Sequence, residues 1–347
     1  MCEEKKKGCG SGCFITVLIT SLILGLLIFA SFIFLIFEIL STSGFESSIS
    51  SFNNTNGLIE KYVEGSKSSS NKIAMIEIRG MIVDNNGTAL WELADSSLIV
   101  RQLMQANNDP TVKAVILYLD TPGGEVTAAD NIYKEVLNLR KSGKIVVVYM
   151  NSVAASGGYY IAVASDYILA HRLCVTGSIG VIMQSYNYNG LLNKIGVFTE
   201  TYKSGKMKDM LDGSRLRTPE EIALANKIVS QIYDEFVRIV SEGRKIPEDK
   251  IKNSEIGDGR IFLGNEALEL GLIDQIGYYE DALYKTLELS KIPVEDYRVI
   301  KYQKTLSFSE IFANLKSSES KISLNLNGIK TFYSFLEPGK AYLLPIY

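Results

Sequence analysis

The chain opens with a long apolar stretch. From Phe14 to Phe37 no residue is charged, and a helix of that length measures about 36 Å, enough to cross a bilayer with some tilt. The apolar core of a cleaved signal peptide is shorter, about 7–15 residues. We therefore predict a transmembrane helix over 14–37. Lysines precede this segment and glutamates follow it, so the positive-inside rule puts residues 1–13 in the cytoplasm and everything after the span outside.

Residues 38–71 are polar and rich in Ser, Asn and Gly. Such a composition is typical of a solvated stalk. A short helix around Leu58 to Val63 is the one element expected within it.

Strand-like and helix-like apolar patterns alternate after residue 72. Short runs of β-branched and aliphatic residues predict buried strands, and longer amphipathic segments predict helices. This alternation indicates βαβ units and a mostly parallel sheet, that is, an α/β fold. The predicted strands cover 73–78, 112–119, 145–150, 166–171, 179–183 and 197–203, and the helices 90–106 and 125–141.

The last third begins with a strong helix signal, Thr218-Pro219-Glu220-Glu221. Threonine is the predicted cap, proline takes the first helical position, and Glu221 closes a capping box. Apolar residues then recur every three or four positions and predict one buried face; they are Ile222, Ala225, Val229, Ile232, Phe236 and Ile239. A short helix over 247–253, a helix within 260–277 and a strand over 297–302 follow. We assign 72–295 to the folded domain and 296–347 to a C-terminal strand and apolar tail.

Charge and cysteine content exclude several classes. The net charge of −3 gives no indication of a nucleic-acid partner. Cys174 is the only cysteine beyond the apolar stretch, so no disulfide framework is expected in the domain. The three N-terminal cysteines lack a nearby fourth ligand. No metal site is predicted.

The candidate chemistry centres on Ser156, which follows the strand over 145–150. The sequence Ala155-Ser156-Gly157-Gly158 surrounds the serine with small residues at a predicted strand-to-helix turn. Its hydroxyl could face a cleft, and the N–H of Gly157 lies at the start of a helix, where it can hold developing negative charge. This is the layout of a nucleophile beside half of an oxyanion hole. A tight strand–helix connection explains the same residues equally well.

A second glycine turn, Thr121-Pro122-Gly123-Gly124, follows the strand over 112–119. In a parallel sheet this turn and the Ser156 turn lie at the same carboxyl edge. We therefore expect the N–H groups of Gly123 and Gly157 to form one oxyanion hole. These residues leave the identity of the general base for Ser156 undecided. The candidates are His171, the only histidine, and three lysines of one loop, Lys203, Lys206 and Lys208. A lysine serves as base only when neutral, which requires desolvation.

Five ordered motifs resemble the signal peptide peptidase SppA (protease IV) family of serine proteases, in its short, single-domain, membrane-anchored form. The similarity covers about residues 72–295. The motifs are Thr121-Pro122-Gly123-Gly124, Ala155-Ser156-Gly157-Gly158-Tyr159-Tyr160, Thr176-Gly177-Ser178-Ile179-Gly180-Val181, the lysine-rich loop 203–209, and Gly259-Arg260-Ile261-Phe262-Leu263-Gly264.

The resemblance implies a ClpP/crotonase-like fold with a Ser–Lys dyad. It puts Ser156 on the nucleophile, Lys208 on the general base and Ser178 on the serine that orients the lysine. Gly123 and Gly157 match the oxyanion amides. The resemblance implies no cofactor, substrates that are signal-peptide remnants and other apolar peptides at the outer face of the cell membrane, and a ring-shaped homo-oligomer. Two alternatives are an acyl-CoA hydratase or isomerase on the same fold, and an inactive scaffold.

Overall fold

The computed structural model describes residues 25–27, 29–32, 34, 58–84, 93–304 and 341–343. The chain divides into two units, residues 1–57 and 58–347. The described residues of the first unit are helical. No helix in the described ranges is both long and apolar enough to span a membrane. Most of the predicted span over 14–37, and the segments around it, lie outside these ranges.

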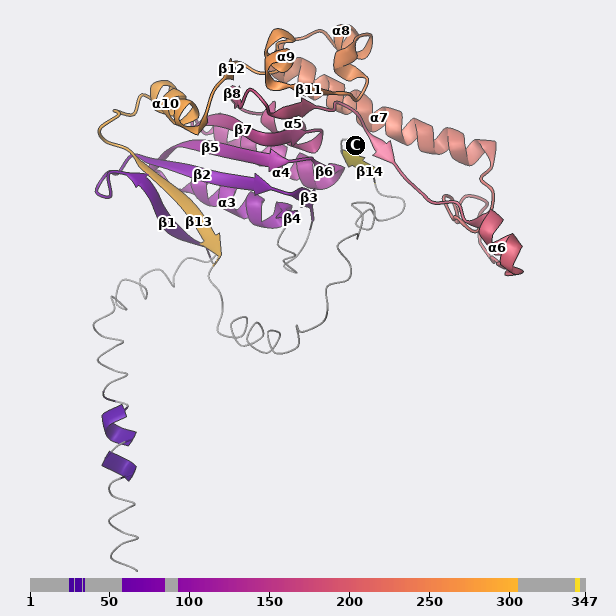
Figure 1. Cartoon of the computed structure of the whole chain (residues 1–347), viewed down its shortest axis with the longest axis horizontal. Helices are drawn as coiled ribbons and strands as arrows, with labels where there is room; N and C mark the ends of the chain where they lie inside the picture. Colours follow the sequence, from indigo (N-terminus) through magenta and orange to yellow (C-terminus); the bar gives the residue numbers. More distant parts are fainter. Residues whose placement is uncertain are drawn as a thin grey trace, which may run out of the picture. The chain divides into compact units, whose positions relative to one another are not determined.

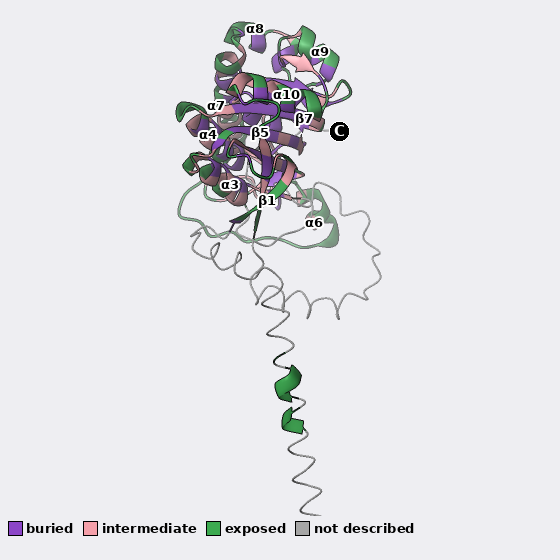
Figure 2. Ribbon diagram, turned by 90° about the vertical axis from the view of Figure 1, so that its left-hand side faces the viewer, coloured by how far each residue is buried: buried purple, intermediate pink, exposed green. Residues whose placement is uncertain are grey.

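The second unit is built on a nine-stranded sheet with the order β1-β13-β2-β5-β7-β8-β12, in which β9 also pairs with β7 and β11 with β9. The central strands are parallel, and most of their residues are buried (Figures 1 and 2). This explains their continuous runs of Val, Ile and Leu, since a parallel sheet is covered on both faces. The bounds are β1 Leu58–Gly65, β2 Lys72–Arg79, β5 Val112–Thr121, β7 Ile145–Ala155, β8 Tyr167–Ala170, β9 Val175–Gly177, β11 Ile261–Leu263, β12 Gln275–Ile276 and β13 Arg298–Lys304.

Alternate side chains of each central strand reach opposite helical layers. Ala74 and Ile76 of β2 belong to the main core, together with residues of helices α3 (Ser96–Asn108), α4 (Val126–Lys141) and α5 (Gly157–Ala162). Ile73 and Met75 pack with Leu283 and Leu287 of α10 (Tyr279–Ser290) on the other face. The predicted α/β fold with βαβ units is therefore observed.

A second, five-stranded sheet has the order β10-β14-β6-β3-β4. It joins short strands from distant parts of the sequence. Strand β14 comes from the C-terminal tail and lies between β10 and β6 (Figure 1). The bounds are β3 Met81–Val83, β4 Leu93–Asp95, β6 Gly124–Glu125, β10 Ile182–Met183 and β14 Ala341–Leu343.

The long helix α7 (Pro219–Arg244) starts as the sequence predicts, with the complete capping box between Thr218 and Glu221. Its C-terminal half is buried in the core at Phe236 and Ile239. The expected stripe does not stay buried over its whole length, because the N-terminal half extends beyond the sheet and leaves Ile222 exposed. This half carries a projecting lobe, residues 184–218, which includes α6 (Asn189–Ile195) (Figure 1).

Four predicted elements differ in the structure. The strand predicted over 179–183 is limited to Ile182–Met183, which form β10. The predicted helix around Leu58 to Val63 is wrong, because these residues form β1, which pairs antiparallel with β13. The strand predicted over 197–203 is also wrong, since no strand lies there and the apolar side chains are exposed. The helix predicted over 90–106 begins only at Ser96, because Leu93–Asp95 form β4 and the side chain of Asp95 accepts hydrogen bonds from the first-turn N–H groups of α3. The remaining elements are α8 Glu248–Lys252, the 3₁₀ turn η2 Glu255–Gly257 and α9 Gly264–Glu269.

Candidate active site

Ser156 occupies a strained turn between β7 and α5. Its φ and ψ are 52° and −113°, in a region that a residue with a Cβ rarely adopts. Two backbone hydrogen bonds hold it there: its N–H donates to Gly177 O at 2.8 Å, and its carbonyl accepts from Tyr160 N at 2.8 Å. A sharp strand-to-helix turn of this kind is how α/β hydrolases present a nucleophilic serine.

The Ser156 hydroxyl is buried and has no hydrogen-bond partner among the described residues. A buried hydroxyl in this state costs about 1–3 kcal/mol. Three other buried polar atoms among the described residues also lack a partner, those of Gln105, Arg298 and Tyr302. Ser156 differs from them in its strained backbone, and the two features together point to a functional group. His171 is not hydrogen-bonded to Ser156; its Nδ1 accepts a hydrogen bond from Leu173 N at 3.2 Å.

The Gly123 turn lies beside the serine. Thr121 pairs with Ala154 across β5 and β7, and a Cβ on Gly158 would lie 2.8 Å from the Thr121 methyl group. Gly123 has a φ of 102°, which favours glycine. Its N–H donates to Thr121 Oγ1 at 3.1 Å, and its carbonyl accepts from Ile82 N at 2.8 Å. The predicted oxyanion amide is thus present near the serine, but the Thr121 hydroxyl engages it in this structure.

Ser178 is held next to the same turn. Gly177 pairs with Ala155, which directly precedes Ser156, and Ser178 follows with a φ of 51°. The Ser178 N–H donates to Arg260 O at 2.8 Å. A Cβ on Gly177 would lie 2.6 Å from the ring of Phe262. The Gly259–Gly264 motif therefore forms the support under Ser178, a structural reason for its place in the sequence.

Lys208 does not lie near Ser156 in the single chain. It is exposed in the lobe that the start of α7 carries, and its N–H donates to Gly205 O at 3.0 Å. Glu221, which is bound to this loop through Arg215, is about 22 Å along the α7 axis from Phe236, at about 1.5 Å per residue. Phe236 contacts Tyr160 of α5, with 5.1 Å between ring centroids. The structure thus brings Ser156, Gly157, Gly123 and Ser178 together and leaves Lys208 in the lobe that is bound to the start of α7.

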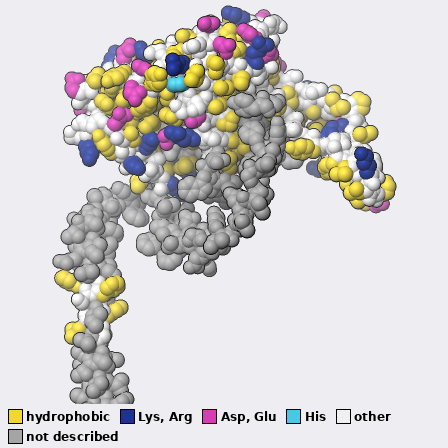
Figure 3. Space-filling view, viewed as in Figure 1, with side chains coloured by type: hydrophobic (Ala, Val, Ile, Leu, Met, Phe, Trp, Pro, Cys, Tyr) yellow, Lys and Arg dark blue, Asp and Glu magenta, His cyan; other side chains and the backbone are white. Residues whose placement is uncertain are grey.

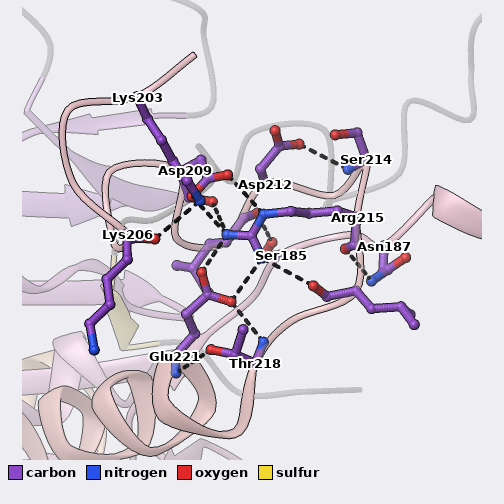
Figure 4. Close-up of polar contacts among 12 residues, drawn as sticks. Ser185, Asn187, Lys203, Lys206, Asp209, Asp212, Ser214, Arg215, Thr218 and Glu221 are labelled. Atoms are coloured by element: carbon purple, nitrogen blue, oxygen red, sulfur yellow. Dashed lines mark hydrogen bonds and ion pairs between the residues drawn. The ribbon is translucent and has the colours of Figure 1, made fainter. Parts of the chain in front are cut away.

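Three features of this region were not predicted. Thr121 accepts a hydrogen bond from the Gly123 N–H. Its position two residues before the glycine could have predicted this bond. Arg215, which binds the lysine loop (Figure 4), gave no recognisable signal, because its partners are close only in the folded loop. The apolar C-terminal tail was expected to dock on its own domain or to visit the cleft, but the strand β14 and its pairing were not predicted. The backbone of β14 pairs antiparallel with β6 and β10, with Leu343 opposite Gly124.

Other reactive groups among the described residues do not form a competing site. Burial raises the pKa of the Cys174 thiol to about 12, which makes it inert as a nucleophile. Within the part of the chain that the structure describes, no three His, Cys, Asp or Glu side chains are grouped as metal ligands would be.

Comparison with known proteins identifies the family of this chain. The model described as "Peptidase family S49" matches residues 138–293. The "Putative signal peptide peptidase SppA" of Enterococcus faecium is 37% identical over 271 residues, covering 77% of each chain. "Protease 4" of Haemophilus influenzae is 36% identical over 219 residues, which are 63% of this chain and 35% of that protein. "Serine protease SPPA, chloroplastic" of Arabidopsis thaliana is 31% identical over 278 residues, 78% of this chain and 40% of that one.

The chain thus spans most of the Enterococcus relative and less than half of the other two. The matched segment contains the Ser156 turn, Ser178, Lys208 and the Gly259–Gly264 motif. On the family match and the relatives' identities, the chain belongs to peptidase family S49, the family of signal peptide peptidase SppA and protease 4, and is a serine peptidase by that membership.

Proposed function

We propose that this chain is a membrane-anchored serine endopeptidase in which Ser156 is the nucleophile and Lys208 the general base. The observation that carries the proposal is the Ser156 hydroxyl, which is buried, unpartnered and held on a strained turn. Backbone strain and unsatisfied buried polar groups are typical of residues prepared for a reaction.

The proposed reaction proceeds in two halves. Ser156 Oγ attacks the scissile carbonyl carbon while Lys208 Nζ takes the hydroxyl proton, and the carbonyl oxygen becomes an oxyanion. The N–H groups of Gly123 and Gly157 stabilise that oxyanion. For this, the Gly123 N–H exchanges Thr121 Oγ1 for the oxyanion, so it remains hydrogen-bonded throughout. The lysine then gives its proton to the departing amine, and water attacks the acyl-enzyme with Lys208 again as base.

The lysine is proposed to come from a neighbouring subunit of a ring. In one chain the lobe that bears Lys208 is far from Ser156, and the lobe is rich in exposed apolar side chains (Figure 3). Phe198, Tyr202 and Leu216 are 81%, 90% and 75% exposed. A head-to-tail contact between identical chains closes into a ring. Such a contact would bury these side chains, remove water from around Lys208, and bring it to the next subunit's Ser156.

The proposed substrate is an extended apolar peptide. Strand β14 pairs with β6 directly after Gly123, and a substrate lying there would gain backbone hydrogen bonds on both sides. A substrate residue at the register position of Tyr342 lies opposite Ile182 and Glu125. It would share a face with Met81, Val83 and Ile182, which pack together. With an anchor over 14–37, the enzyme would meet apolar peptides such as signal-peptide remnants at the outer face of the cell membrane.

A fluorophosphonate probe and mixed subunits test this proposal. The probe should label Ser156 in the full-length protein, and both Ser156→Ala and Lys208→Ala should lose peptidase activity by several orders of magnitude. When the two inactive variants exchange subunits, some interfaces pair an intact serine with an intact lysine, so activity should partly return. Near wild-type activity in Lys208→Ala would refute the base. Verified mixed oligomers without activity would refute the shared site.

A further inference from the structure

The loop that carries Lys208 is held by a cluster of ion pairs, here called the Arg215 cluster: Arg215, Asp209, Glu221 and Lys203 (Figure 4). Arg215 donates from Nε to Asp209 Oδ2 and from Nη2 to Asp209 Oδ1, both at 2.8 Å. Its Nη1 donates to Glu221 Oε2 at 3.0 Å, and its Nη2 to Glu221 Oε1. One guanidinium thus binds two carboxylates in the paired geometry that only arginine provides.

The cluster joins the loop to a rigid element. Glu221 is the third residue of α7 and closes its capping box by accepting from Thr218 N at 2.8 Å. Lys203 Nζ donates to Asp209 Oδ1 at 2.6 Å and to Lys206 O at 3.2 Å. The side chains of Asp209 and Glu221 are only 9% and 1% exposed. The residue directly after Lys208 is therefore fixed to the start of a 26-residue helix.

The charges of the Arg215 cluster cancel. Two cations, Arg215 and Lys203, face two anions, Asp209 and Glu221. The hydrogen bonds from Arg215, with those from Thr218, hold the pKa of Glu221 at about 2, and the bonds from Arg215 and Lys203 hold the pKa of Asp209 well below its usual range. Both acids stay ionised near neutral pH. The other charged groups of the loop and the adjoining helix start are Lys206, which pairs with Glu220, Asp212, which caps Ser214 N, and Arg217.

We propose that Arg215 is a positioning residue for Lys208: it fixes the lysine loop to α7 and neutralises the carboxylate next to the base. This inference rests on the proposed function, since it takes Lys208 as the base. A lone carboxylate beside a lysine favours the charged ammonium form, and an ammonium cannot accept the Ser156 proton. Asp209 directly follows Lys208 in the chain, and its charge is cancelled by Arg215 and Lys203.

The test is the pH dependence of Ser156 labelling by a fluorophosphonate, measured on the full-length protein. Arg215→Met leaves Asp209 and Glu221 with only Lys203, so the pH of half-maximal labelling should rise by about 0.5–1 unit, and the maximal rate should fall as the loop loosens. Arg217→Met is the matched control. It removes one positive charge from the same loop, but its guanidinium donates to Ser185 Oγ and Tyr186 O rather than to a carboxylate.

Two further variants separate charge from structure. Lys203→Met removes a partly exposed cation of the cluster and should raise the half-maximal pH in the same direction, so it decides the question if Arg215→Met fails to fold. Adding Asp209→Asn to Arg215→Met removes the uncompensated charge and should return the half-maximal pH toward the wild-type value. A merely structural role would predict no such return.

The outcomes distinguish this inference from the proposed function. If Lys208→Ala is labelled as fast as the wild type, the proposed base is wrong. If Lys208→Ala is not labelled while Arg215→Met and Lys203→Met keep the half-maximal pH of Arg217→Met, the base stands and the role of Arg215 is refuted. A shift in both cluster variants with return in the double variant supports it.

Discussion

Ser156→Ala is expected to stabilise the fold while it abolishes activity. The hydroxyl is fully buried and lacks a partner among the described residues, which costs about 1–3 kcal/mol. Alanine also has a Cβ, so the strain at a φ of 52° remains. The expected gain is therefore about 1–2 kcal/mol from the hydroxyl alone. For a domain of this size it should raise Tm by roughly 2–6 °C.

The assay is thermal unfolding followed by circular dichroism, with Ser156→Ala introduced into Lys208→Ala. In that background no neighbouring lysine can satisfy the hydroxyl, so the full gain should be seen. Ser165→Ala, in the turn that follows α5, is the control, because Ser165 Oγ donates to Ala162 O at 2.7 Å. Its loss should destabilise the fold by about 0.5–1.5 kcal/mol. A lower Tm for the Ser156 variant would refute the view that this hydroxyl is kept at a cost.

Three further predictions concern the lobe and the tail. The pKa of Glu221 is lowered to about 2, mainly by its hydrogen bonds from Arg215. The contribution of the Glu221 carboxylate to stability is therefore present above about pH 4.5, the usual glutamate range, and is lost as the pH falls toward 2. Glu221→Gln should lower the urea midpoint of unfolding at pH 7 and lower it much less at pH 3. An equal decrease of the urea midpoint at both pH values would contradict this. Deleting residues 335–347 should lower KM for short apolar peptides several-fold, because β14 occupies the strand position between β6 and β10, and an unchanged KM would show that the tail does not compete. Phe198→Glu places a charge on an 81% exposed ring and should give a smaller, inactive species by light scattering, whereas an active oligomer of unchanged size would remove this side chain from the proposed interface.

The sheet and its helices could be predicted because each central strand is buried on both faces. Ile73 and Ala74 face different helical layers, so the apolar run is continuous and bounded by turn residues. The start of α7 was predictable for a local reason, since Thr218 and Glu221 are three residues apart and bond each other. The short strands were not predictable. Strand β6 has two residues, and its partners β3 and β14 come from distant parts of the chain.

The parts of the site that depend on local chain geometry could be predicted from the sequence. The Ser156 and Gly123 turns follow neighbouring parallel strands, so the common carboxyl edge places them together. The hydrogen bond from the Gly123 N–H to Thr121 Oγ1 was not foreseen, because it depends on a side-chain rotamer within the turn. The support of Ser178 by Arg260 O likewise joins residues far apart in sequence.

The two errors in the lobe have one physical cause. Apolar periodicity predicts that a face is buried, but it does not predict whether the same chain or another chain covers that face. The 197–203 segment and the first half of the α7 stripe both have the patterns of buried elements, and both are exposed in the single chain, Ile222 at 49% and Tyr202 at 90%. Isolated exposed apolar residues need no explanation, whereas several gathered on one projecting lobe indicate a contact surface. The lysine expected to act on Ser156 lies on the same lobe, tied to α7 by Arg215. On the proposed function, a contact that covers the lobe and a contact that supplies the base are therefore most simply one contact, and Arg215 bonds the lysine loop to the start of α7 on that surface.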